Sequence, residues 1–513
     1  MINLKEHITD NGEVLLYQGN PNINLFDTLA SSEGDIWHSS LDQGYKNVFP
    51  EIVYQTAVFF WYAQDFDELD KSVSWRINPN AFVVRKKVWE TFNGFDLDYE
   101  NLQASALDFG FNTIRYQGVV PLYVKGLFEA SQGEAKISTK DIYTFYIKNF
   151  KCAQSIYMLL RRGIWKPNEL KSFLFAKNKF HFKDKSILLK PRELNEIEGG
   201  EPKVSYIIPT MMRQDFTMNL LNDLERQTYK PFEVIVVDAT PEEARDEFIY
   251  NADNYSFRVV FKWQTTKGSC RARNEAIALC TGDYIVFGDD DIRIQPQFIE
   301  NHVRLLQTYK AEACNGLDIR ADHQEQNLND LDAKLKAMGN ARWKVGAAQS
   351  FSNANSCVSR SVVDVLIGND INYDGGYGED GDFGLSIAKL GVTVLHNPFA
   401  VNLHLKPPIG GYRFWGQQAG LKGKKRKKQP WELDTPVKWI VPKPSPTIMY
   451  QLFKHFDERQ RKEYKIKYFV FYFTKAKIIE LPLRLLKFPL KILQFNRSVF
   501  YAKKLIALGK RTK

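Results

Sequence analysis

A stretch at positions 268–291, GSCRARNEAIALCTGDYIVFGDDD, constrains the fold more than any other part of this chain. Apolar side chains recur at helical spacing in its first half, and a Thr-Gly pair ends that pattern. The run 284–287 then predicts a short buried strand between two glycines. Adjacent like charges at a strand end are costly to desolvate, and a divalent cation with oxygen ligands relieves that cost. The carboxylates at this strand end are Asp289, Asp290 and Asp291.

An isolated acidic triplet is more often a solvated turn, because aspartate is common in turns. Here the triplet follows a strand, and the strand follows a helical segment that carries Arg271 and Arg273. Ligands of open α/β sheets bind outside the carboxyl ends of the strands. The context therefore favours a metal and phosphate site over a solvated turn.

Apolar runs that alternate with helical patterns predict an α/β fold with a mostly parallel sheet and flanking helices. We expect the first of these runs to stop at Pro209, and Asp238 lies at the carboxyl end of the second. The predicted strands cover 204–208, 232–237, 258–261 and 284–287.

The chain of 513 residues is long enough for several domains. A polar segment with Gly and Pro at 190–203 indicates a linker. Five cysteines without a CxxC pair predict neither a zinc site nor a disulfide framework, which favours a reducing compartment. We expect no signal peptide and no transmembrane helix, because no suitable apolar run occurs. The expected domains are 1–195, 203–445 and 446–513.

Four motifs in order carry a resemblance to a known family. VSYIIPTMMR, FEVIVVDAT, the stretch 268–291 and GGYGEDGDFGLSIAKLG resemble the motifs of family 2 glycosyltransferases, which have the GT-A fold. The resemblance covers about residues 203–415. The chain departs from the family pattern at Met211-Met212, where Tyr-Asn is frequent, and at Ala239-Thr240, where a second acid or a serine is frequent.

The resemblance implies a donor site and a metal site. Asp289 and Asp291 form the DxD pattern that holds Mn²⁺ or Mg²⁺, and His404 is a candidate third ligand, with His396 as its competitor. Gly410-Gly411 precede Arg413 in a loop that is expected to close on the diphosphate. The residues expected at the donor are Pro209, Thr210, Met211, Asp238, Arg271, Asp289, Asp290 and Arg413.

The resemblance also implies an acceptor site after Gly378. Asp380 is the expected base that takes the proton of an acceptor hydroxyl, with Glu379 beside it. The alternative for this acid pair is a solvated loop after a glycine-rich turn. Trp415 is expected either to stack on a sugar ring or to fill the core.

The first part of the chain repeats features of the acceptor half with a one-residue gap. In this register Ser105 and Ala106 take the places of the two acids. We therefore expect a shortened, inactive α/β relative of the acceptor half, and chance similarity is the alternative. A weaker match pairs 33–36 with 281–284. The matched residues are Asn80 with Asn355, Arg85 with Arg360, Tyr99 with Tyr373, and 108–110 with 382–384.

The net charge of +10 is concentrated at the end of the chain. Residues 461–513 contain 15 Lys and Arg against Glu463 and Glu480, a balance of about +13, which leaves about −3 for the rest. This distribution argues against a nucleic-acid-binding body. Basic and apolar residues at helical spacing predict an amphipathic tail on an anionic membrane surface. We expect Pro482 and Pro489 to break this segment into short helices. The alternative is a helical appendage docked on the protein.

These features together predict an inverting, metal-dependent glycosyltransferase on the cytoplasmic membrane face. It would move a sugar from a nucleotide donor, UDP-linked, to a hydroxyl of a growing surface glycan, with a lipid-linked glycan as one form of acceptor. A non-catalytic glycan- or nucleotide-binding scaffold is the first alternative. A sugar nucleotidyltransferase is the second, but PTMMRQD lacks the glycines of a phosphate loop.

Overall fold

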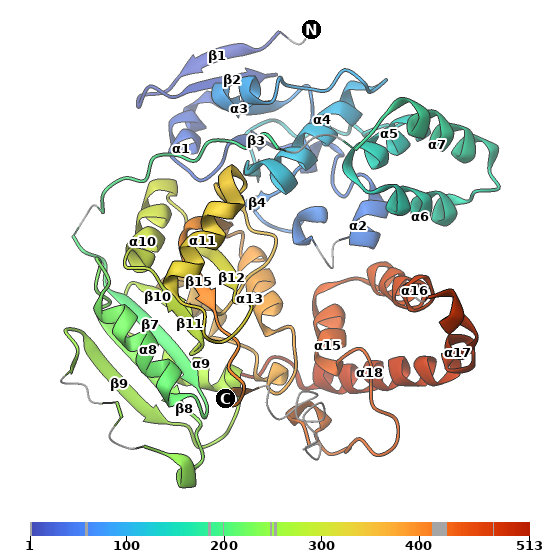
Figure 1. Cartoon of the computed structure of the whole chain (residues 1–513). Coiled ribbons are helices and arrows are strands. Elements are labelled where there is room, and N and C mark those ends of the chain that lie inside the picture. Colours follow the sequence, from blue (N-terminus) through green and yellow to red (C-terminus); the bar gives the residue numbers. More distant parts are fainter. Residues whose placement is uncertain are drawn as a thin grey trace.

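A computed structural model of the chain describes residues 3–56, 60–182, 186–197, 200–246, 249–250, 254–412, 428–475 and 477–513. These residues form a six-stranded sheet, a nine-stranded sheet and a set of C-terminal helices (Figure 1). The smaller sheet and its helices come from the first part of the chain. The larger sheet follows, and the last helices lie beside both.

The smaller sheet has the strand order β1-β2-β5-β3-β6-β4. Only β3 and β6 pair in parallel. Its strands are β1 (Lys5–Ile8), β2 (Val14–Gln18), β3 (Ile36–His38), β4 (Lys71–Val73), β5 (Phe82–Arg85) and β6 (Pro121–Val124). The helices of this part are α1 (Phe26–Ala30), α2 (Pro50–Thr56), α3 (Lys86–Thr91), α4 (Leu102–Asn112), α5 (Thr139–Asn149), α6 (Cys152–Arg162) and α7 (Pro167–Lys179).

The larger sheet has the strand order β11-β15-β12-β14-β10-β7-β8-β9, and β13 pairs with β15. It is parallel from β10 to β9 and between β12 and β15, whereas β14 is antiparallel to both neighbours. The strands are β7 (Val204–Thr210), β8 (Glu233–Asp238), β9 (Arg258–Trp263), β10 (Tyr284–Gly288), β11 (Ile292–Ile294), β12 (Ala313–Arg320), β13 (Gly346–Ala347), β14 (Asn355–Ser359) and β15 (Val394–His404). The helices are α8 (Gln214–Glu225), α9 (Ser269–Ile277), α10 (Phe298–Tyr309), α11 (Leu328–Met338), α12 (Arg360–Leu366) and α13 (Glu379–Ala388).

The predicted α/β fold with flanking helices is confirmed, with each of the four predicted strands ending one or two residues later than expected. Strand β7 does not stop at Pro209 but continues to Thr210. Pairing with β10 ends at Ile207, so the last residues of β7 pair only with β8. Proline is tolerated where a strand has a neighbour on one side only.

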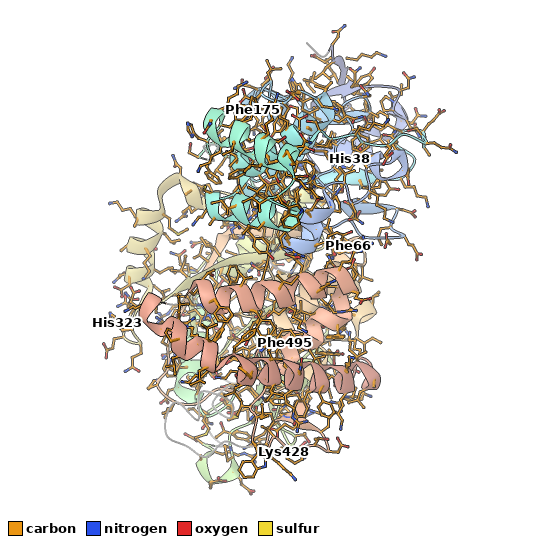
Figure 2. The ribbon with its side chains drawn as sticks, turned by 90° about the vertical axis from the view of Figure 1, so that its right-hand side faces the viewer. His38, Phe66, Phe175, His323, Lys428 and Phe495 are labelled. Carbon is orange, nitrogen blue, oxygen red and sulfur yellow. The ribbon has the colours of Figure 1, made fainter. Side chains whose placement is uncertain are left out.

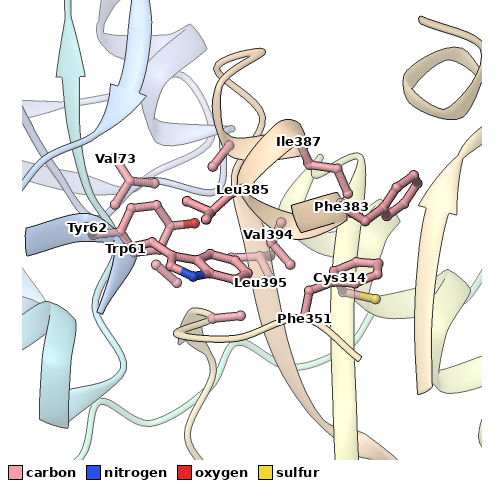
Figure 3. Close-up of a cluster of buried hydrophobic side chains, with 14 of the residues drawn as sticks. Trp61, Tyr62, Val73, Cys314, Phe351, Phe383, Leu385, Ile387, Val394 and Leu395 are labelled. Carbon is pink, nitrogen blue, oxygen red and sulfur yellow. The ribbon is translucent and has the colours of Figure 1, made fainter. Parts of the chain in front are cut away.

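One continuous apolar core joins the two sheets. Trp61 and Tyr62 from the first part of the chain lie against Leu385 of α13 and Val394 of β15 (Figure 3). A Cβ atom on Gly384 would lie 2.4 Å from Cη2 of Trp61, so this helix position accepts only glycine without rearrangement. The first part of the chain therefore packs directly on the helix that carries the predicted acid pair.

The C-terminal helices are packed on the protein at both ends of the segment. Met449 and Tyr450 of the first helix and Tyr501 and Leu505 of the last are buried. The prediction of short helices is wrong for the end of the chain, because Pro489 lies in the first turn of a 21-residue helix, where proline is tolerated. The helices are α15 (Pro446–His455), α16 (Glu458–Thr474), α17 (Leu481–Leu486) and α18 (Phe488–Leu508). Within the described residues, no helix is long and apolar enough to cross a membrane.

The repeat seen in the sequence is also present in the strand pairing. β3 pairs antiparallel with β5 and parallel with β6, as β12 pairs with β14 and β15. β3 thus takes the place of β12 and not of β10, and the weaker match of 33–36 with 281–284 is wrong. That match rested on a short local pattern, whereas strand position depends on long-range pairing.

The repeat continues into the helices. α5 and α15 both end at a phenylalanine with extended backbone, Phe150 and Phe456. In both copies a glutamine in the first turn of the next helix then accepts a hydrogen bond from the backbone N–H of the N-cap residue, Gln154 from Lys151 and Gln460 from Asp457. Figure 2 shows the α5–α7 helices, marked by Phe175, above the α15–α18 helices, marked by Phe495.

Candidate active site

The predicted metal ligands lie together at the edge of the larger sheet. Asp289 and Asp291 follow β10, and His404 ends β15, which pairs with β11 so that His404 lies opposite Ile292. One ligand atom from each of the three side chains lies within 4.8 Å of the others. His396 is not in this cluster, and burial lowers its pKa to about 4.

His404 is held between two carboxylates. Its Nε2 lies 3.3 Å from Oδ1 of Asp291, and its Nδ1 lies 3.1 Å from Oδ1 of Asp318. Burial alone would lower the pKa of His404, but hydrogen bonds to the two carboxylates raise it to about 10. Asp318 was not predicted from the sequence. It belongs to β12, and only the parallel pairing of β12 with β15 brings it to His404.

Arg213 is a second cation at the acidic triplet that the sequence did not indicate. Its Nη1 lies 3.0 Å from Oδ1 of Asp290 and 2.8 Å from Oδ2 of Asp291. Asp290 also accepts a hydrogen bond of 2.8 Å from Oγ1 of Thr210. Burial raises the pKa of Asp290 to about 7, although Arg213 opposes the shift. The triplet is thus a buried acidic site that already attracts cationic groups.

The ligand atoms of Asp289, Asp291 and His404 suit a divalent cation. Carboxylate oxygens and an imidazole nitrogen are ligands that Mn²⁺ accepts. A ligating histidine usually donates its other N–H to a carboxylate, and Asp318 lies in that position on Nδ1 of His404. A metal ion on Nε2 of His404 would replace a proton there and would compete with Arg213 for the carboxylate of Asp291.

The residues predicted to contact the base are buried at the ends of β7 and β8. Oδ1 of Asp238 accepts hydrogen bonds from N and Oγ1 of Thr240, at 2.7 Å and 2.6 Å. Its Oδ2 accepts one of 2.8 Å from Tyr250. Met211 is fully buried. Asp238 therefore orders the chain around the predicted base site through these internal bonds.

The two arginines of α9 contact different acids. Arg273 donates a hydrogen bond of 2.6 Å to Oδ1 of Asp289, within the acidic triplet. Arg271, the arginine predicted at the diphosphate, has its Nε 3.5 Å from Oδ2 of Asp374. Burial raises the pKa of Asp374 to about 7. The sequence singled out Arg271, whereas in this structure Arg273 is the one that contacts the triplet.

The predicted acid pair begins helix α13. Gly378 is the N-cap residue with a φ of +105°, a conformation that favours glycine. Glu379 is buried, and Oδ1 of Asp380 accepts a hydrogen bond of 2.6 Å from Asn353. The pair thus starts a helix in a glycine-rich loop instead of lying in a solvated turn. Arg413 and Trp415 lie outside the described residues.

The fold and the site together define a class of protein. It is an α/β domain that carries buried acids and cations at the carboxyl edge of its sheet. Residues 205–366 match the family model described as glycosyl transferase family 2. Over these residues the chain is similar to that family, and the resemblance seen in the sequence is confirmed there.

Several relatives match part of this domain. Glycosyltransferase GlyA of Streptococcus pneumoniae is 25% identical over 23% of this chain and 17% of its own length. An uncharacterized glycosyltransferase of Haemophilus influenzae is 31% identical over 20% of this chain and 34% of its own length. The amylovoran biosynthesis glycosyltransferase AmsB of Erwinia amylovora is 28% identical over 21% of this chain and 37% of its own length. The chain thus spans about a third or less of most of these relatives.

Solved structures give distant matches. Residues 1–349 of S. aureus TarS in complex with UDP-GlcNAc are 15% identical, covering 60% of this chain and 83% of that chain, with a TM-score of 0.38. The mannosyltransferase PcManGT of Pyrobaculum calidifontis, with GDP-Man and Mn²⁺, is 17% identical over 61% and 89%, with a TM-score of 0.34. Scores this low carry no conclusion about substrate.

Proposed function

We propose that the protein is an inverting, metal-dependent glycosyltransferase that moves a sugar from a nucleotide-sugar donor, UDP-linked, to a hydroxyl of a growing surface glycan. The observation that carries the proposal is the cluster of Asp289, Asp291 and His404 in a family 2 domain. The name of the amylovoran relative supports a polysaccharide as the acceptor class. A lipid-linked glycan at the inner membrane face is the form of acceptor that we propose.

The proposed chemistry is a single displacement. The acceptor oxygen bonds to the anomeric carbon as the bond from that carbon to the phosphate oxygen breaks, which inverts the configuration. Asp380 takes the proton of the attacking hydroxyl. Mn²⁺ or Mg²⁺, held by Asp289, Asp291 and His404, would neutralise charge on the departing nucleoside diphosphate. Arg273, which lies beside Asp289, supports the same site by adding a fixed positive charge.

We also propose a membrane contact at one corner of the C-terminal helices, which we call the α17 corner (residues 475–493). Its apolar residues Leu485 and Leu486 are 62% and 79% exposed. The corner has five basic residues, Lys475, Lys477, Arg484, Lys487 and Lys491, against Glu480. Exposed leucines among lysines are the composition of segments that lie in an anionic interface. Residues of α15 and of the second half of α18 are buried against the protein, so the contact that we propose is narrower than the sequence predicted.

Calorimetry of UDP binding with and without Mn²⁺ tests the donor proposal. Wild-type protein should bind UDP more tightly with Mn²⁺, and Asp291→Ala should lose that gain while remaining folded. Asp364→Ala removes an exposed carboxylate of α12 and serves as the matched control. Equal UDP affinity with and without Mn²⁺ in the wild type would contradict the metal-dependent donor site. Metal-dependent binding without sugar release or transfer would favour the scaffold alternative.

A further inference from the structure

The loop that carries the acid pair is enclosed by helix α15. We call residues 369–382 the acid-pair loop. The backbone N–H of Tyr377 donates a hydrogen bond of 2.8 Å to Oγ1 of Thr447. A Cβ atom on Gly376 would lie 2.3 Å from the same Oγ1, and one on Gly381 would lie 2.4 Å from Nε2 of Gln451. The glycines of the loop are therefore needed for its close contact with α15.

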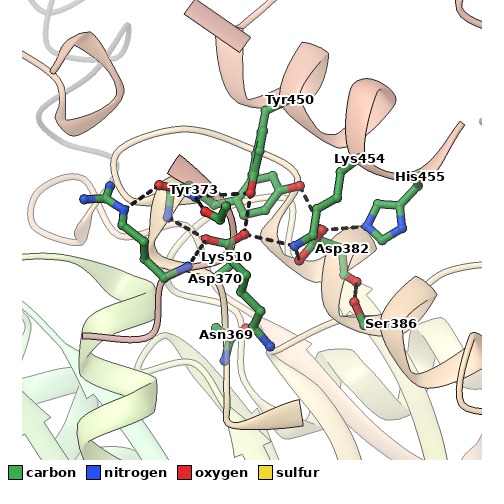
Figure 4. A network of polar contacts seen from close by, with 12 residues as sticks. Asn369, Asp370, Tyr373, Asp382, Ser386, Tyr450, Lys454, His455 and Lys510 are labelled. Atoms are coloured by element: carbon green, nitrogen blue, oxygen red, sulfur yellow. Dashed lines mark hydrogen bonds and ion pairs between the residues drawn. The ribbon is translucent and has the colours of Figure 1, made fainter. Parts of the chain in front are cut away.

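Lys454 of α15 ties the two ends of this loop together. Its Nζ lies 2.9 Å from Oδ2 of Asp370 and 2.9 Å from Oδ2 of Asp382 (Figure 4). Asp382 also accepts a hydrogen bond of 3.0 Å from Tyr373 and lies 2.6 Å from Nε2 of His455. Both carboxylates are buried. Charge-assisted hydrogen bonds in such a site are stronger than neutral ones, so Lys454 fixes the spacing of the loop ends.

The end of the chain closes the same loop from the other side. The backbone N–H of Ile371 donates to O of Arg511 at 2.8 Å, and Nε of Arg511 donates to Oδ1 of Asn372 at 2.8 Å. Asn274 of α9 donates to O of Thr512 at 2.8 Å. Figure 1 shows this terminus beside α9. The α15–α18 segment thus begins and ends at the acid-pair loop.

The first copy of the repeat has the same buried acid but a different cation arrangement. Burial and the carboxylate of Asp108 raise the pKa of Tyr99, as burial and Asp382 raise that of Tyr373. Asn149, in the place of His455, donates a hydrogen bond of 2.5 Å to Asp108. Lys148, in the place of Lys454, pairs with Asp96, the counterpart of Asp370 in this register, and with Asp98. The lysine of the first copy thus has Asp98 as its second acid, whereas Lys454 has the helix acid Asp382.

We propose that Lys454 and Thr447 are positioning residues for the proposed glycosyl transfer, and that they act by holding the acid-pair loop so that Asp380 meets the acceptor hydroxyl. This inference rests on the proposed role of Asp380. Asp380 lies two residues before Asp382 in the first turn of α13, so a shift of the Asp382 anchor also moves Asp380. A misplacement of about 1 Å can lower a rate by about 10²-fold.

Steady-state kinetics of substitutions in α15 test the proposal. Lys454→Met and the milder Thr447→Val should lower kcat by about 10- to 100-fold, with the donor KM within about twofold of wild type. Thr447→Ser keeps the hydroxyl and should restore kcat. Lys504→Met removes an amine of the same tail that pairs with the exposed Asp434, and it should behave as wild type. Wild-type kcat in both folded variants, or an equal loss in Thr447→Ser and Thr447→Val, would overturn the inference.

Hydrogen exchange separates this inference from the proposed function. If the wild type turns over no nucleotide sugar, the proposed function fails, but the loop can still be examined. Amides of residues 374–382 should exchange faster in Lys454→Met than in Lys504→Met. Equal exchange in the two variants would show that Lys454 does not hold the loop, whatever the reaction.

Discussion

At the residue scale, two cationic side chains neutralise the acidic triplet, one that would compete with a metal ion and one that would bind it after losing a proton. Arg213 bridges Asp290 and Asp291, and His404 bridges Asp291 and Asp318. The metal-free site is therefore neutralised by the protein itself. This arrangement gives two predictions about metal binding.

Arg213→Met should tighten Mn²⁺ binding in the absence of nucleotide. A hydrogen bond to a charged group contributes about 1.5–3 kcal/mol, so removal of the competing cation should raise the affinity by about 10- to 100-fold. Calorimetry or the relaxation rate of water protons can measure this affinity. Arg226→Met, on the far end of α8, is the control. Weaker Mn²⁺ binding in Arg213→Met would show that Arg213 supports the site instead of competing for it.

Metal affinity should rise with pH because of His404. Its pKa in the folded protein is raised from 6.5 to about 10, so below that value Mn²⁺ must displace a proton. We expect the affinity to increase by nearly tenfold per pH unit between pH 7 and 9. In the metal-free protein, the stabilisation from the raised pKa is complete below pH 6.5 and is lost as the pH rises through about 10. His404→Gln should bind Mn²⁺ weakly. Its Mn²⁺ affinity and its free energy of unfolding should both depend less on pH than those of the wild type.

Residue types in local patterns were sufficient to place the acidic triplet at a strand end, whereas His404 and the acid pair were singled out by the resemblance to a family. Neither was sufficient for Arg213, Asp318 or Lys454. Asp318 reaches His404 through the pairing of two strands, and Lys454 reaches Asp370 because the chain returns to the site. Such contacts join residues distant in sequence, and no local spacing encodes them.

At the element scale, the strands were predicted to within a few residues because they are apolar runs, of which β7 and β8 are buried throughout. The tail was harder to interpret, because the same lysines and leucines suit a membrane and a protein surface. In the structure, α15 and the second half of α18 pack on the protein, whereas the leucines of the α17 corner are exposed.

The α17 corner should bind anionic vesicles. Leu485→Ser combined with Leu486→Ser should reduce sedimentation with vesicles that contain phosphatidylglycerol by about 10-fold or more, since each buried CH₂ contributes about 0.8 kcal/mol. Leu97→Ser, at a site 93% exposed in the first part of the chain, is the control. Substitution is a better test than truncation, because truncation also removes α15. Equal sedimentation of the two proteins, or no preference for anionic lipid, would contradict the membrane contact.

At the scale of the whole molecule, the shared core should make the two sheets unfold together. Gly384→Ala places a methyl group 2.4 Å from Trp61 and should cost about 1–3 kcal/mol, the usual effect of overpacking. Calorimetry should then show one transition at a lower temperature. Gly133→Ala, whose new Cβ would meet its nearest atom at 3.4 Å, should leave the transition unchanged. If calorimetry instead showed two transitions, and Gly384→Ala lowered the temperature of only one, the two sheets would unfold independently.

The matching order of strands and helices in the two copies has a consequence for the history of the chain. Because α5 and α6 follow the smaller sheet as α15 and α16 follow the larger one, we propose that both arose from a single ancestral segment that already contained sheet and helices. On this proposal the helices are as old as the sheets that they follow. Phylogenetic trees built separately from the two copies in homologous chains should branch in the same order, and the later copy should have diverged more slowly around its acids.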